Sequence, residues 1–204
     1  ADVRPGDILE LQAQIVRCDA EAVAYGGRAT IGGKLAIELV DCVGPMLPLA
    51  EFDDPDALRA DLALLEGAGA PAGRFGGVPE PSFDAVEHEP GKRRAARLRV
   101  PADAPLFGDH FPRKPVYPGT LLLDALAGLG LAVAAEALPG ANPAVREVRD
   151  VKIRAFTPPG AVLDCSAELI GADAGGVRLK LGARGEDGKA VAGARLFAAA
   201  GDAR

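Results

Sequence analysis

An internal repeat limits the folds open to this 204-residue chain more than any other feature. Near the N-terminus a Pro-Gly turn opens an alternating strand, and the same pattern returns near the C-terminus. Two unrelated meanders that share common turn residues are the alternative interpretation. The agreement in both order and spacing favours a true duplication. A shift that places Pro5 on Pro159 also aligns Gly6 with Gly160, Leu9 with Leu163, Asp19 with Asp173, Ala20 with Ala174, Val23 with Val177 and, after one inserted residue, Gly33-Lys34 with Gly188-Lys189.

Each copy of the repeat predicts three β-strands, because apolar and polar residues alternate along it. The expected strands span about 8–16, 20–31 and 35–43 in the first copy, and about 159–170, 177–184 and 190–198 in the second. Between the copies, a Pro90-Gly91 turn joins alternating segments and predicts a hairpin. A further strand is expected over about 145–156.

A short helix and a linker are expected before this hairpin. Asp53-Asp54-Pro55 supplies an N-cap residue and a first-turn proline, and leucines follow at helical spacing until Gly67. Residues 67–81 are rich in Gly, Ala and Pro and are interpreted as a linker. The expected organisation is therefore the strands of a first, truncated unit with a short helix (1–66), the linker (67–81) and a complete second unit (82–204).

Residues 120–138 are almost entirely apolar and approach the length of a membrane-spanning helix. Such a span would place Asp124 in lipid at a cost of a few kcal/mol, whereas a helix buried within a protein is equally apolar. Over 82–200 the order is strands, one long helix and four strands, and only an antiparallel sheet wrapped around that helix buries it on most sides. The sequence predicts an α+β fold of this kind and no membrane span.

The composition supports a sizeable core and argues against one class of partner. Hydrophobic residues make up 49% of the chain and Trp is absent, so Ala, Val, Leu and Ile must build the core. A net charge of −6 argues against nucleic-acid binding. Cys18, Cys42 and Cys165 stand apart, which predicts neither a disulfide framework nor a metal site and suits a cytoplasmic setting. No signal peptide is visible, and the natural start is expected upstream of Ala1 because the one methionine is Met46.

The segment 106–126 carries the residues best suited to chemistry. Three prolines stiffen a short loop that contains His110, and Pro118-Gly119 leads into the long helix. The first turn of a helix offers free backbone N–H groups and the positive end of the dipole, and Gly119 lets a ligand approach them closely. Asp124 lies within the apolar helix, where a buried carboxylate is costly without a function or a partner. Together these groups predict an acid–base pair beside an oxyanion site.

The pattern HFPxxPxxPG followed by an acid resembles the β-hydroxyacyl-acyl-carrier-protein dehydratases of fatty acid synthesis. Glu89-Pro90-Gly91-Lys92-Arg93, Val151-Lys152-Ile153-Arg154 and Pro159-Gly160 are similar to that family as well, and the resemblance covers about 82–200. It implies a hotdog fold, in which an antiparallel sheet wraps a long central helix. It also implies an active site between two hotdogs, with the histidine from one and the acid from the other.

The resemblance assigns roles to individual residues. His110 matches the catalytic histidine, Asp124 matches the acid, and Gly119 matches the glycine whose N–H polarises the thioester carbonyl. Imidazole changes charge near neutral pH, so His110 suits removal of the C2 proton. Asp124, if its surroundings keep it protonated, assists loss of the hydroxyl group. Phe111, Tyr117 and Pro118 are the candidate substrate contacts, with packing inside the loop as the alternative for the two aromatic side chains.

The implied activity is dehydration of (3R)-hydroxyacyl thioesters to trans-2-enoyl thioesters in fatty acid, polyene or polyketide synthesis. The expected partners are an acyl carrier protein and a second hotdog unit, either in a homodimer or within one chain. No cofactor or metal is expected. Basic residues within 86–156 form either a docking face for an acidic carrier or ordinary solvated surface.

Some residues depart from the family pattern. Asp109 replaces a small residue before His110, and Gly128 stands where the helix usually carries Gln. The N-terminal copy predicts strands alone, so its helix and histidine loop are expected upstream of Ala1. A degenerate hotdog that supports an active partner and a hotdog thioesterase therefore remain alternatives. A structural His110 and an Asp124 paired with Arg113 or Lys114 are the corresponding alternatives at the site, and His88 is interpreted as a solvated edge residue.

Overall fold

The computed structural model describes residues 3, 6–69, 78 and 80–201, without the side chains of residues 85 and 86. Most of the predicted linker therefore lies outside the described residues. The chain divides into two compact units, Ala1–Glu51 and Phe52–Arg204. The division predicted from sequence placed the short helix with the N-terminal strands, whereas the contacts group it with the larger unit.

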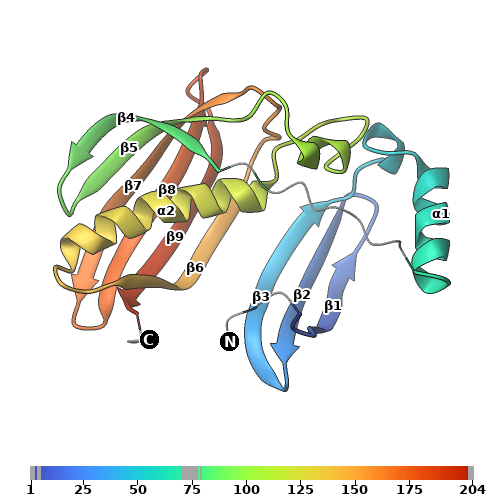
Figure 1. Ribbon diagram of the computed structural model, residues 1–204, viewed down its shortest axis with the longest axis horizontal. Helices are drawn as coiled ribbons and strands as arrows, with labels where there is room; N and C mark the ends of the chain where they lie inside the picture. Colours follow the sequence, from blue (N-terminus) through green and yellow to red (C-terminus); the bar gives the residue numbers. More distant parts are fainter. Residues whose placement is uncertain (1–2, 4–5, 70–77, 79, 202–204) are drawn as a thin grey trace. The chain divides into compact units, whose positions relative to one another are not determined.

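The larger unit is a six-stranded antiparallel sheet that curves around one long helix, α2 (Gly119–Ala137) (Figure 1). The strand order is β4-β5-β7-β8-β9-β6. This arrangement, with the sheet curved around one face of the helix, is the predicted α+β hotdog fold. The strands are β4 (Ser82–Glu89), β5 (Arg93–Arg99), β6 (Pro143–Ile153), β7 (Val162–Asp173), β8 (Gly176–Gly185) and β9 (Ala190–Ala200), and a short 3₁₀ helix, η2 (Pro105–Gly108), lies between β5 and α2.

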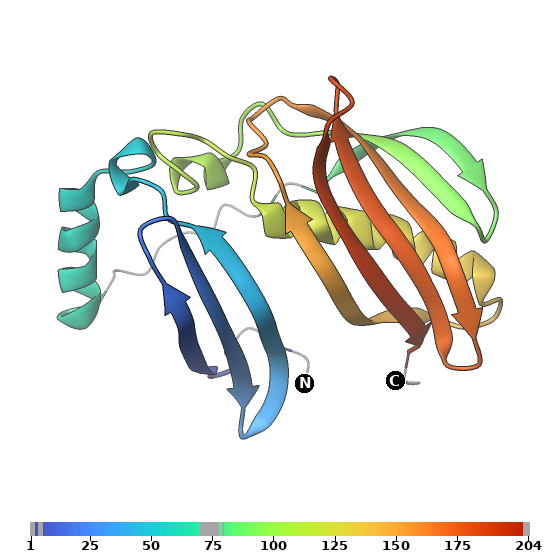
Figure 2. The same cartoon turned by 180° about the vertical axis from the view of Figure 1, so that it is seen from behind.

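The core forms where one face of α2 packs against the concave side of the sheet, which Figure 2 shows from behind. Leu122, Leu126 and Val133 of the helix are at most 1% exposed. They meet inward side chains of β5, β7, β8 and β9, such as Leu98 and Leu179. Burial of each such side chain stabilises the fold by about 1.5–3 kcal/mol. The length and apolarity of α2 match those of a membrane span, and the sheet accounts for its apolar face.

Burial of α2 on most sides was predicted, and within this chain that prediction is wrong. The buried residues of the helix all lie on the face toward the sheet. Thr120, Asp124 and Gly128 follow one another at intervals of four and are exposed on the opposite face. The physical reason is that a single sheet covers one side of a helix and leaves the opposite side exposed.

The N-terminal unit is a three-stranded antiparallel sheet made of β1 (Glu10–Cys18), β2 (Ala22–Ile31) and β3 (Lys34–Pro45), followed by the 3₁₀ helix η1 (Leu49–Glu51). Its strand pairing repeats that of β7 and β8. Glu10 pairs with Thr30 as Asp164 pairs with Arg184, which are the residues aligned by the sequence repeat. Both ladders also shift register at the aligned place, between Ile15 and Arg17 and between Leu169 and Gly171.

The two copies differ in what covers their apolar side chains. In the larger unit Cys165 is 2% exposed because it faces α2, whereas the aligned Leu11 of β1 is 75% exposed. Ile15 and Ile37 are also exposed. The N-terminal sheet therefore keeps the pairing of a helix-covered sheet, although the described residues of its own unit form no α-helix.

The helix α1 (Pro55–Glu66) forms as the sequence predicts. Asp54 is its N-cap, with side-chain oxygen accepting hydrogen bonds from the N–H groups of Asp56 and Ala57, and Gly67 is its C-cap. These local signals place both ends of the helix correctly. They do not indicate which part of the molecule the helix contacts.

Candidate active site

His110 is held by hydrogen bonds in the loop between η2 and α2. Its N–H donates to the Leu106 carbonyl oxygen at 2.9 Å, and its own carbonyl oxygen accepts from the N–H of Val116 at 2.9 Å. The ring Nδ1 lies 2.9 Å from the carbonyl oxygen of Val116. Because a carbonyl oxygen can only accept, Nδ1 must donate, and in the neutral ring Nε2 then carries the lone pair. The loop thus fixes the tautomer that can take up a proton at Nε2.

Phe111 packs against the histidine ring. The two ring centroids lie 4.2 Å apart with an interplanar angle of 26°. On its other side Phe111 meets Phe52 edge to face, with centroids 5.3 Å apart. The structure therefore places Phe111 between His110 and a residue outside the loop, and its role as a substrate contact stays a prediction.

Tyr117 and Pro118 connect the loop to the helix. Tyr117 donates its N–H to the Thr157 carbonyl oxygen at 2.7 Å and is 3% exposed within the core. Burial raises the pKa of its phenol, and the charges of Asp124 and then Cys165 raise it further. Pro118 is half-buried at the N-cap of α2, where its carbonyl oxygen accepts from Leu122 N–H. Their predicted contacts with substrate likewise stay predictions.

Gly119 is the first residue of α2, so its N–H has no acceptor within the helix. From the sequence, a glycine was expected at this position because it lets a ligand approach the backbone closely. The structure adds a packing reason, since a Cβ at this position would lie 3.2 Å from Cγ1 of Ile153 on β6. An alanine at this position would therefore require the Ile153 side chain and the helix start to separate by a few tenths of an ångström.

Asp124 lies on the exposed face of α2, five residues or about 7.5 Å along the helix from Gly119. The expectation of a buried carboxylate is wrong within this chain, because the side chain points away from the sheet-covered face. After burial, its charge contributes to the raised pKa of Tyr117, which lies two residues before the start of α2. No hydrogen bond or ion pair joins Asp124 to His110 among the described residues, and the pairing with Arg113 or Lys114 is not observed there either.

Sequence reasoning missed the contribution of the segment before α1. The Phe52 carbonyl oxygen accepts a hydrogen bond from Arg113 N–H at 2.9 Å, and the Arg113 guanidinium lies 3.1 Å from the Asp54 carboxylate. The Lys114 ammonium lies 4.7 Å from the centre of the Phe52 ring. The cap hydrogen bonds from the N–H groups of Asp56 and Ala57 lower the pKa of Asp54, and the Arg113 charge lowers it further. These contacts join residues more than fifty positions apart in the sequence, so no local sequence pattern predicts them.

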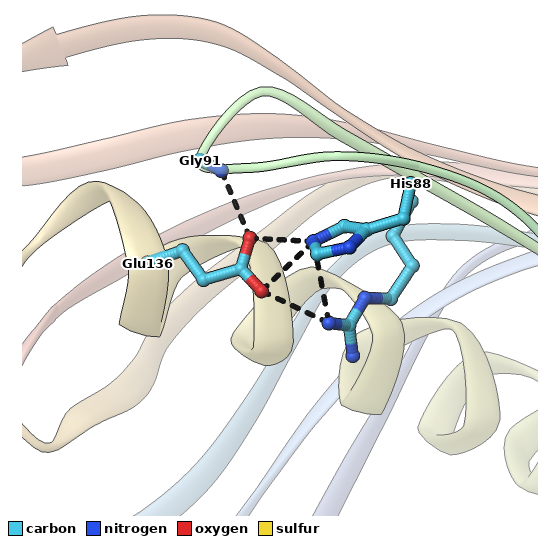
Figure 3. A network of polar contacts seen from close by, with 4 residues as sticks. His88, Gly91 and Glu136 are labelled. Carbon is cyan, nitrogen blue, oxygen red and sulfur yellow. Dashed lines mark hydrogen bonds and ion pairs between the residues drawn. The ribbon is translucent and has the colours of Figure 1, made fainter.

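His88 is exposed on the edge strand β4, as expected, and it also has partners that the sequence did not indicate. Its Nε2 lies 2.9 Å from both carboxylate oxygens of Glu136, near the C-terminal end of α2 (Figure 3). The N–H of Gly91 and the Arg94 guanidinium donate to the same carboxylate. The bond to His88, then that to Gly91, lowers the pKa of Glu136. This cluster attaches the β4–β5 hairpin to the end of α2 that lies away from His110.

The candidate site lies within a part of the chain that matches a known protein family. The sequence profile described as ApeI-like, ApeI dehydratase, matches residues 86–194, which include His110, Gly119 and Asp124. Within the described residues, no group of three or more His, Cys, Asp or Glu side chains could hold a metal ion.

Curated relatives and a solved structure give further likenesses. A 3-hydroxyacyl-acyl-carrier-protein dehydratase FabZ of Clostridium acetobutylicum is 36% identical over 90 residues, covering 43% of this chain and 64% of that protein. A FabZ of Ruminiclostridium cellulolyticum is 37% identical over 109 residues, covering 52% of this chain and 76% of that protein. The crystal structure of S. sahachiroi AziG shares 16% identity at a TM-score of 0.49, covering 59% of this chain and 90% of that one. The hotdog assignment rests on the strand order and on the long helix that packs against the sheet.

Proposed function

Because this chain belongs to the ApeI-like dehydratase family, we propose that it removes water from (3R)-hydroxyacyl thioesters and forms trans-2-enoyl thioesters. The observation that carries the proposal is the hydrogen bond from His110 Nδ1 to the Val116 carbonyl oxygen. This hydrogen bond leaves Nε2 as the proton acceptor, in the loop that leads into the N-terminus of α2, where the first N–H groups can bind an oxyanion. A base and an oxyanion site are the two groups that removal of a C2 proton requires.

In the proposed reaction His110 Nε2 takes the proton from C2 of the acyl chain. The Gly119 N–H, at the positive end of α2, stabilises the negative charge that develops on the thioester oxygen. The C2–C3 double bond then forms as the C3–O bond breaks. The Asp124 carboxylate accepts a hydrogen bond from the departing hydroxyl group. The His110 imidazolium gives the proton taken from C2 to that hydroxyl group, so that water leaves and both side chains return to their starting state.

We propose an acyl carrier protein as the bearer of the thioester. The relatives from Clostridium and Ruminiclostridium are both named for a substrate on such a carrier. Lys114, Lys152 and Arg154 are exposed on the histidine loop and around the end of β6, which suits an acidic carrier. The setting proposed with this function is the cytoplasm, in fatty acid, polyene or polyketide synthesis.

We also propose that a second hotdog unit completes the site. The exposed acid of Asp124 and the uncovered face of α2 support this proposal. The second unit is either another copy of the chain or the hotdog to which the strands of 1–51 belong, since these repeat the pairing of β7 and β8. Mixing His110→Ala with Asp124→Asn tests the first source, because two inactive variants would then share one intact site. Full turnover by a monomeric variant that begins at Phe52 would contradict both sources.

One assay separates this function from the alternatives. The wild-type protein is incubated with a 3-hydroxyacyl thioester, and ultraviolet absorbance follows the conjugated enoyl product while a thiol reagent follows free thiol. Enoyl product without thiol supports the dehydratase. Thiol without enoyl product would indicate a thioesterase, and neither product from the folded protein would indicate a supporting role; both results contradict the proposal.

A further inference from the structure

The histidine loop is held from outside by a segment that the matched family region does not include. That region begins at residue 86, whereas Phe52 and Asp54 precede α1. The Phe52 carbonyl oxygen accepts the N–H of Arg113, and Asp54 pairs with the Arg113 guanidinium. The segment before α1 therefore contacts the loop through both backbone and side chain.

The Phe52 ring extends this contact toward the histidine. It is 7% exposed and meets three loop or neighbouring side chains. The rings of Phe111 and Phe156 lie edge to face with it at 5.3 and 5.6 Å, and the Lys114 ammonium lies over it at 4.7 Å. Because the ring is buried among these three side chains, its removal would leave a gap beside Phe111.

Phe111 transmits the packing of Phe52 to the catalytic ring. It is stacked on His110 at 4.2 Å while its edge contact with Phe52 fixes its other side. The hydrogen bond of Nδ1 to Val116 sets the tautomer of His110 and holds one edge of its ring. The stack with Phe111 contacts the face of that ring, and Phe52 in turn restricts Phe111.

We propose that Phe52 is a positioning residue for His110, acting through Phe111 from outside the hotdog sheet. The expected effect on turnover rests on the proposed function, whereas the expected effect on the orientation of the His110 ring does not. An aromatic pair of this kind shifts an equilibrium between two side-chain arrangements by about 2- to 10-fold.

The test compares Phe52→Leu with Phe52→Tyr and with the matched control Phe197→Leu. The leucine keeps the backbone bond to Arg113 and removes the ring, and the tyrosine keeps the ring. Phe197 lies on β9, where its ring contacts Arg178. The readout is the ¹⁵N and ¹H signals of the imidazoles, which are simple to assign because the chain contains 2 histidines. His88, bonded to Glu136, is the internal reference.

With Phe52→Leu, the His110 signals are expected to move toward those of a ring in exchange between orientations, while the His88 signals stay in place. Turnover of the thioester is expected to fall about 2- to 10-fold through kcat, with KM little changed. Phe52→Tyr restores both readouts, and Phe197→Leu changes neither. Unmoved His110 signals in folded Phe52→Leu would overturn the inference. If the wild type shows no dehydratase activity but the His110 signals respond, the proposed function fails and the positioning role stands.

Discussion

Replacement of Gly176 by alanine tests how closely β8 and β9 pack at the end of the sheet. Gly176 has φ of +149°, and a Cβ there would lie 2.3 Å from the carbonyl oxygen of Ala198. Gly188, in the β8–β9 turn, also has a positive φ, +76°, but a Cβ there would meet nothing within 4 Å. The two positions therefore separate backbone strain from steric collision.

The magnitudes follow from these geometries. A left-handed alanine costs about 1–2 kcal/mol, so Gly188→Ala should lower the free energy of unfolding by that amount alone. Gly176→Ala carries strain of about 1–3 kcal/mol and must also displace the backbone of β9, for a combined loss of roughly 3–5 kcal/mol, near the upper end for single substitutions. Since about 1 kcal/mol corresponds to roughly 2–4 °C in a domain of this size, Tm should fall by roughly 2–8 °C for Gly188→Ala and by roughly 6–20 °C for Gly176→Ala.

The assay is thermal unfolding followed by circular dichroism at several protein concentrations, with wild type beside both variants. Equal losses for the two substitutions would refute the argument, because they would show that β8 and β9 separate at no cost at Gly176. A larger loss for Gly188→Ala would refute it more strongly.

Three further predictions concern the core, the hairpin cluster and the site. The Leu126 side chain is 0% exposed, so Leu126→Ala should lower the free energy of unfolding, measured in urea, by about 2–5 kcal/mol. Leu62 on α1 is 55% exposed, so Leu62→Ala should change that free energy little. Equal effects of the two substitutions would contradict the assigned core. Glu136→Gln should lower Tm at pH 7. Because folding lowers the pKa of Glu136, its ionised carboxylate stabilises the folded protein above the ordinary pKa of 4.5, and this stabilisation is lost as the pH falls through the folded-state pKa. A difference in Tm between wild type and Glu136→Gln that grows as the pH is lowered would contradict this prediction. Gly119→Ala keeps the N–H but presses its Cβ against Ile153, so misplacement of the helix start should reduce turnover by about tenfold. Ile153→Ala in the same chain should restore part of it by making room for the added methyl group.

Local signals in the sequence were sufficient for the elements and the fold class. Asp54, Pro55 and Gly67 determine α1, because caps and a first-turn proline act within a few residues. The repeat predicted three strands in each copy, and the paired ladders share a register shift at aligned positions. Such features depend on neighbours in the chain, so they can be predicted from one sequence.

Features that depend on distant contacts could not be predicted in the same way. The packing of Phe52 on Phe111 and the bonding of His88 to Glu136 join residues far apart in sequence. The exposure of Asp124 could have been predicted, because Thr120, Asp124 and Gly128 share one helix face at a spacing of four. The near-uniform apolarity of the helix concealed this less apolar face.

The central claim is that His110 removes the C2 proton of a hydroxyacyl thioester, and the presence of 2 histidines permits a direct test. The rate of enoyl thioester formation is measured for wild type, His110→Ala and His88→Ala, with circular dichroism confirming that each is folded. The account predicts product from wild type and His88→Ala and a loss of at least about 100-fold in His110→Ala. Undiminished product from folded His110→Ala would contradict it.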